Sequence, residues 1–124
     1  MKKLIPVIVL IIGILPFYSF SQTYRQISPE AVKELLQEKV QVLDVRTGEE
    51  FAEGHLPGAV LANWKDQKAF RKSVRKLSKK QPILIYCKSG NRSKSAAEWM
   101  IKKGFKEIYE LEGGIMKYRK KENQ

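Results

Sequence analysis

The sequence predicts a single α/β domain, and three observations support this fold class. The chain has 124 residues, a length that one hydrophobic core can serve. From Gln22 onward, apolar runs of strand length alternate with segments of helical period, without a long linker or an internal repeat. Residues 83–86 form a continuous apolar run, which is typical of a parallel strand buried on both faces.

The N-terminal segment has the layout of a secretory signal peptide. Two lysines precede an almost purely apolar run over residues 4–15. Ser19 and Ser21 then place small residues three and one positions before a cleavage point at Gln22. We therefore predict that residues 1–21 are a signal peptide and that the protein is exported, as a periplasmic or secreted protein.

An uncleaved membrane anchor is the alternative for this segment, because the apolar stretch 4–20 approaches the ~17 residues of the shortest spanning helices. The folded part would then lie close to a membrane. Either way, residues 22–124 are expected to form the domain. The whole chain carries 24 basic and 13 acidic residues, a formal net charge of +11, so its surface is expected to attract anions.

The first two elements of the domain are predicted from a helix cap and a β-branched run. Ser28 is a favourable N-cap residue, and Pro29 suits the first position of a helix. Apolar residues then recur on one face, so a helix is expected over residues 28–38. Residues 40–45 are rich in β-branched side chains, which predicts a buried strand with polar groups at its carboxyl end.

Three further elements follow in the middle of the chain. Thr47 and Glu50 have the spacing of a capping box, which predicts a short turn of helix. Residues 54–58 contain two glycines and a proline and are expected to form a loop, followed by a short strand over 59–62. Apolar residues at helical spacing predict a second substantial helix over residues 65–77.

The last third of the domain contains the central strand and two more elements. The apolar run 83–86 delivers the chain to Cys87 at its carboxyl end. Apolar residues within 96–101 then predict a helix that Gly104 ends. Residues 108–111 are expected to form a last strand, and a basic helix or tail finishes the chain.

Residues 65–80 form a strongly basic segment, with eight lysines and arginines against one aspartate. We interpret it as a solvated helix face with a basic extension. The alternative is a surface that guides anionic donors, an acidic protein partner or a membrane. Binding to nucleic acid is not expected, because the chain is expected to be exported and carries no recognised binding motif. Trp64 and Trp99 are interpreted as packing residues.

The chain has one cysteine, Cys87, and one histidine, His55. A single cysteine cannot form an intramolecular disulfide, so in an exported protein this thiol is either buried or used. One cysteine and one histidine are too few for a protein zinc site, which takes three or four ligands. We therefore expect chemistry at Cys87 without a metal.

Cys87 opens a short loop between the central strand and the next helix, at the end of the sheet where open α/β folds bind ligands. Amides wrapping back on the sulfur, the helix dipole and nearby cations would favour the thiolate over the thiol. The alternative is a buried cysteine that only ends a core strand. The residues expected to bind the substrate are Lys88, Ser89, Gly90, Asn91, Arg92 and Ser93.

Spaced motifs of this chain resemble those of the rhodanese-like family of single-domain thiosulfate sulfurtransferases. Residues 87–93 resemble its active-site loop, 44–46 its first-strand motif and 50–59 its second motif. Residues 111–114 resemble its closing motif, although Ile115 stands where tryptophan is often found. The resemblance implies a three-layer domain with a central parallel sheet of about five strands flanked by helices. It also implies that no metal or organic cofactor is needed.

The resemblance further implies that Cys87 is catalytic and carries a sulfane sulfur as a persulfide. A small sulfur-containing anion such as thiosulfate would be the donor, and cyanide or a thiol would be the acceptor. Separately from the resemblance, we expect the protein to act as a monomer. The alternative is a sulfur-carrier or redox-sensing module that meets only a protein partner. Asp44 and Arg46 are expected to form a supporting ion pair rather than to touch substrate. His55 is expected to order its loop by hydrogen bonding rather than to shuttle protons.

A cysteine-based phosphatase is the rival within the same chemistry. Such enzymes place five residues between the cysteine and the arginine of the loop, whereas four separate Cys87 from Arg92. The shorter loop is expected to hold one sulfur atom better than a phosphate with its oxygens.

Overall fold

The computed structural model describes residue 3 and residues 23–124, so the predicted signal peptide or anchor lies outside the described residues. No helix within the described part is long and apolar enough to cross a membrane. Five strands alternate with five helices along this part of the chain. In chain order they are β1 (Arg25–Ile27), α1 (Pro29–Gln37), β2 (Gln41–Asp44), α2 (Gly48–Ala52), β3 (Ala59–Leu61), α3 (Gln67–Val74), β4 (Ile83–Tyr86), α4 (Asn91–Lys102), β5 (Ile108–Leu111) and α5 (Gly114–Glu122).

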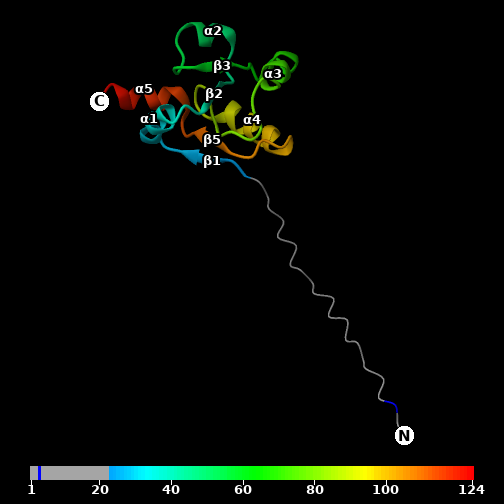
Figure 1. The fold of residues 1–124 in the computed structure, drawn as a ribbon. Coiled ribbons are helices and arrows are strands. Elements are labelled where there is room, and N and C mark those ends of the chain that lie inside the picture. The colour runs from blue at the N-terminus through cyan, green and yellow to red at the C-terminus, as the bar shows by residue number, and fades with distance from the viewer. Residues whose placement is uncertain (1–2, 4–22) are drawn as a thin grey trace.

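The strands form one parallel sheet in the order β1-β5-β4-β2-β3, which confirms the predicted three-layer α/β architecture. Alternate residues of β4 supply two separate cores. Ile83 and Ile85 pack with α3 and α4, while Leu84 and Tyr86 pack with α1 and α5. Figure 1 shows these two helix pairs on opposite sides of the sheet. Because β4 lies in the middle, all four of its residues are buried.

Most predicted elements are present with small shifts of their ends. The capping box of Thr47 and Glu50 forms and begins α2 as predicted. The predicted helix 65–77 is shorter, because the Asp66 side chain accepts a hydrogen bond from Ala69 N and starts α3 at Gln67. The chain ends in the helix α5 rather than in a tail.

Two details differ from the sequence-based expectation. Ser28 occupies the N-cap position of α1, but its side chain makes no capping hydrogen bond, so Pro29 marks the helix start instead. The segment after Cys87 was expected to be loop as far as Ser93. Instead α4 begins at Asn91, so the last three of those residues form the first turn of a helix.

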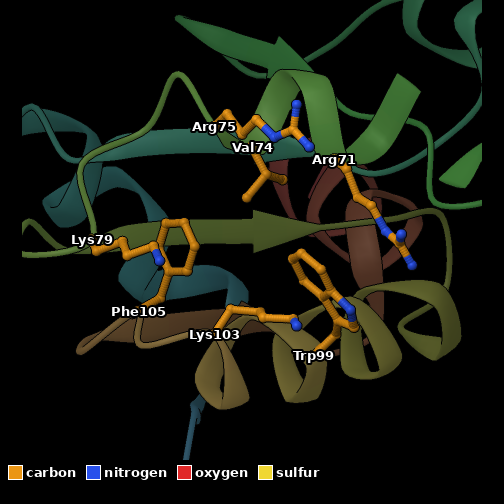
Figure 2. A pocket seen from close by; sticks show the side chains of 7 residues that line it. All are labelled: Arg71, Val74, Arg75, Lys79, Trp99, Lys103 and Phe105. Carbon is orange, nitrogen blue, oxygen red and sulfur yellow. The ribbon is translucent and has the colours of Figure 1, made fainter. Parts of the chain in front are cut away.

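A basic hollow of about 330 Å³ lies between α3 and α4, beside the start of β4 (Figure 2). Trp99 lines it and packs edge-on against Phe70, which in turn packs edge-on against Trp64, so both tryptophans are packing residues as predicted. The four cations at its rim form no ion pair with any residue that the structure describes. The hollow is lined by Arg71, Val74, Arg75, Lys79, Trp99, Lys103 and Phe105.

Candidate active site

The thiol of Cys87 lies directly after β4 and is 1% exposed. It points to the same side of the sheet as Ile83 and Ile85, toward α4. Two polar groups contact it: Gly90 N donates a hydrogen bond to Sγ at 3.0 Å, and Ser93 Oγ lies 3.2 Å from Sγ. A covered sulfur that accepts a hydrogen bond from a backbone amide differs from an inert core thiol, which packs as a small apolar group.

The loop after Cys87 turns sharply into α4. Gly90 has φ +108°, a left-handed conformation that side chains rarely adopt, and it is the N-cap residue of the helix. We expected several loop amides to face the sulfur; among those from Lys88 to Ser93, the amide of Gly90 donates to it. The positive end of the α4 dipole lies at the same place. Lys88, Ser89 and Asn91 are exposed, whereas Ser93 is fully buried.

The start of α5 holds the backbone of this loop. Ile115 N donates to the Cys87 carbonyl at 2.9 Å, and Met116 N donates to the Lys88 carbonyl at 3.1 Å. Because a trans peptide directs its N–H opposite to its carbonyl, the amides of Lys88 and Ser89 point away from α5. Gly114 lies so close that a Cβ atom there would be 2.6 Å from Ser89 N and closer still to the Lys88 carbonyl group. The lack of a side chain at position 114 therefore allows α5 to lie close enough to form its hydrogen bonds with the loop.

Arg92 is tied to α2 rather than free to meet a donor anion. Its guanidinium makes two hydrogen bonds to the Glu50 carboxylate, at 2.7 and 3.0 Å. These bonds are the main reason that the pKa of Glu50 falls to about 2, and the hydrogen bond from Thr47 N acts in the same direction. Glu50 thus caps α2 and clamps it to the first turn of α4. Since its charge is compensated, Arg92 positions the loop, and Lys88 is the exposed cation beside it.

Asp44 and Arg46 form the expected ion pair, with Arg46 Nη2 2.7 Å from Asp44 Oδ2 and both side chains buried. Tyr86 also donates to Asp44, at 2.8 Å. Arg46 then donates to the Gly54 carbonyl at 2.7 Å, and Leu56 N donates to the Tyr86 hydroxyl at 3.0 Å. This network joins the ends of β2 and β4 to the loop before β3, so it braces the edge of the sheet that carries Cys87.

His55 lies in that same loop and is exposed. Its Nδ1 is 3.1 Å from the Phe51 carbonyl, and its ring stacks on the Phe51 ring at a centroid distance of 3.8 Å. Both contacts join His55 to α2 and order the turn between α2 and β3. His55 has no contact with the Cys87 thiol among the hydrogen bonds of the described residues.

Sequence reasoning missed Glu110, a fully buried carboxyl on β5. Ser93 Oγ donates to Glu110 Oε2 at 3.0 Å, and Gln26 Nε2 donates to Oε1 at 3.0 Å. Burial raises the pKa of Glu110 above that of an ordinary carboxyl, against the opposing effect of these two hydrogen bonds. The signal was present in the strand pattern, because Glu110 follows Ile108 by two residues and so shares its buried face.

No cluster of three or more histidine, cysteine or acidic side chains suited to a metal ion occurs in the described part of the chain. The Gly90 amide and the Ser93 hydroxyl contact the Cys87 sulfur, and Ser93 also bonds to the Glu110 carboxyl. This arrangement suits covalent chemistry at sulfur.

Comparison with known proteins agrees with this geometry. The family model described as Rhodanese-like domain matches residues 28–121, which include the strands β2 to β5, the Cys87 loop and α5 except its last residue. The chain belongs to the rhodanese-like domain family. This rhodanese-like chain is 33% identical over 99 residues to the thiosulfate sulfurtransferase GlpE of Pseudomonas aeruginosa, which covers 80% of this chain and 87% of the relative.

Other similar proteins include one much longer relative and two solved structures. The chain is 38% identical over 100 residues to a tRNA uridine(34) hydroxylase of Chlamydia trachomatis, but the match covers only 31% of that protein and 76% of this chain. Among solved structures, a rhodanese-related protein of Thermoplasma volcanium matches with a TM-score of 0.69 and 26% identity, over 79% of this chain and 93% of the other. A rhodanese-like domain protein of Staphylococcus aureus matches with a TM-score of 0.67 and 29% identity, over 76% and 90%.

Proposed function

We propose that this rhodanese-like protein is a sulfurtransferase that moves a sulfane sulfur from a small anion such as thiosulfate to cyanide or a thiol. One observation carries the proposal: the thiol of Cys87 ends the central strand and is held by Gly90 N and Ser93 Oγ at the start of a helix. The likeness to the thiosulfate sulfurtransferase of Pseudomonas aeruginosa supports the choice of donor class.

The reaction proceeds in two half-reactions at Cys87. The thiolate attacks the outer sulfur of thiosulfate, the sulfur–sulfur bond of the donor breaks, and sulfite leaves with the bonding electron pair. Cys87 is then a persulfide. The acceptor attacks the outer persulfide sulfur, and Cys87 leaves as the thiolate that began the cycle. Because the first product departs before the second substrate reacts, ping-pong kinetics are expected.

The loop has three tasks in this scheme. Gly90 N donates to the cysteine sulfur and holds negative charge there. Lys88, which is exposed, attracts the anionic donor, while Ser89 and Asn91 line its approach. Since Cys87 is 1% exposed, the exposed side of the loop has to shift when a donor arrives.

We further propose that the protein works outside the cytoplasm, as the signal-peptide-like residues 1–21 suggest, and that it acts as a monomer. An uncleaved N-terminal segment would instead keep residues 22–124 beside a membrane. The intact mass of the exported protein distinguishes these two forms.

Thiocyanate formation from thiosulfate and cyanide is the test of the proposed function. We expect turnover with initial-rate plots typical of ping-pong kinetics, and we expect Cys87→Ser to reduce it to the uncatalysed background because the nucleophile is gone. Ser95→Ala, which alters an exposed hydroxyl on α4, serves as the matched control and should keep wild-type turnover. Persulfide formation without turnover would favour the carrier alternative, and hydrolysis of an aryl phosphate would favour the phosphatase.

A further inference from the structure

Three side chains form a buried hydrogen-bonded chain behind the reactive sulfur. Cys87 Sγ lies 3.2 Å from Ser93 Oγ, and Ser93 Oγ lies 3.0 Å from Glu110 Oε2. Ser93 and Glu110 are fully buried and Cys87 is 1% exposed. We propose that Glu110 takes and returns the proton of Cys87 through the Ser93 hydroxyl. The inference rests on the proposed role of Cys87 as the nucleophile, and it assigns Glu110 as a positioning residue that acts through Ser93.

The hydroxyl of Ser93 has one proton and can donate to only one neighbour at a time. When Ser93 donates to an ionised Glu110, Cys87 keeps its proton and donates it to Ser93 Oγ. When Glu110 is protonated, it donates to Ser93 Oγ, and Ser93 donates to the Cys87 thiolate. Shifting two protons along the chain converts the first state into the second without gain or loss of charge. The second state contains the nucleophile.

The surroundings of Glu110 favour the protonated form that this relay requires. Burial is the largest influence and raises the pKa of Glu110. Gln26 on β1 and Ser93 on α4 oppose it through their hydrogen bonds, as does the more distant charge of Lys94. The negative charge of Glu112, which follows on the same chain segment, raises it further. Tyr24 is another titratable group near Glu110, and the charge of Glu110 contributes to the raised pKa of Tyr24.

The topology explains why these groups meet. In the parallel register Ile85 pairs with Glu110, and Cys87 lies two residues beyond Ile85 on the same face. That face is covered by α4, whose first turn supplies Ser93. Positions on β5, α4 and the end of β4 therefore converge at the sulfur.

A shared proton predicts a distinctive titration. Cys87 and Glu110 lose two protons in two coupled steps, and between the steps a fixed fraction of molecules holds the thiolate. The rate of alkylation should therefore rise, level off and rise again between about pH 4 and pH 9, the interval bounded by ordinary carboxyl and thiol groups.

The test is the rate of iodoacetamide alkylation of the full chain across that pH interval. Glu110→Gln keeps the size of the side chain and its hydrogen bonds to Gln26 and Ser93 but cannot take a proton. We expect the lower step to vanish, leaving a single ionisation of the thiol. Glu112→Gln, which removes a nearby exposed carboxylate, should keep both steps. A wild-type profile with one step, or two steps that persist in Glu110→Gln, would overturn the proposal.

Ser93 provides a second, independent variant. Ser93→Ala breaks the chain and should also leave one step, with alkylation near neutral pH at least about tenfold slower because the thiolate loses a hydrogen bond. Ser93→Thr keeps the hydroxyl and should restore both steps; a single step in Ser93→Thr with intact folding would contradict the relay. Alkylation needs no sulfur donor. A two-step profile without thiocyanate formation would therefore uphold the relay and reject the sulfurtransferase, and the reverse result would reject only the relay.

Discussion

Gly114→Ala is expected to lower thiocyanate turnover by about 100-fold, the scale of effect that a misplacement near 1 Å can produce at a reacting centre. The new Cβ would lie 2.6 Å from Ser89 N and nearer still to the Lys88 carbonyl, so α5 and the loop have to separate. That separation breaks the hydrogen bonds that Ile115 N and Met116 N donate to the carbonyl groups of Cys87 and Lys88. The measurement is the steady-state rate, corrected for the folded fraction determined by circular dichroism.

Gly114 has φ +66°, so Gly114→Ala adds backbone strain as well as the contact with the loop. Gly104→Ala is the control that adds the strain of a positive φ without that contact. Gly104 has φ +95°, and the nearest atom to a Cβ there is Lys79 Cδ at 4.0 Å, so the substitution strains the backbone without touching the loop. It should keep turnover near the wild-type value per folded molecule. If Gly114→Ala keeps more than about a third of wild-type turnover, the close contact between α5 and the loop does not position Cys87.

Asp44→Ala is expected to reduce the free energy of unfolding by about 3–5 kcal/mol, because it leaves the buried guanidinium of Arg46 without its carboxylate. The Tyr86 hydroxyl loses its acceptor in the same substitution. Since domains of this size have a total stability of only about 5–15 kcal/mol, the effect is large. Urea unfolding followed by tryptophan fluorescence provides the measurement.

The control for this prediction is a surface pair of the same chemistry. Glu112 lies 3.4 Å from Lys117, and both side chains are about half exposed. Glu112→Ala should change the free energy of unfolding by less than about 1 kcal/mol. If Asp44→Ala costs no more than Glu112→Ala, the brace formed by Asp44 and Arg46 is not a source of stability.

Local patterns predicted much of the fold. The apolar run of β4 and the capping box of α2 could be read directly, because each is determined by residues adjacent in sequence. The strand β1 was missed, since its three residues Arg25, Gln26 and Ile27 have no apolar alternation and pair only with β5, far along the chain. A short edge strand of this kind is defined by its partner rather than by its own sequence.

In the candidate site too, features set by adjacent residues could be predicted, whereas contacts between distant residues could not. Cys87 and Gly90 were identified from the loop itself. The partner of Arg92 was not, because Glu50 is 42 positions away and its capping role already accounted for its presence. Glu110 was read as part of a strand, and only the register of β4 with β5 brings it beside Ser93. Contacts between distant segments therefore account for what the sequence could not supply.

The central claim is that Cys87 accepts a sulfane sulfur, and the intact mass of the protein after incubation with thiosulfate tests it most directly. We expect a gain of about 32 Da that maps to the peptide containing Cys87 and disappears when cyanide is added. No gain in mass, or the same gain in Cys87→Ser, would contradict the account.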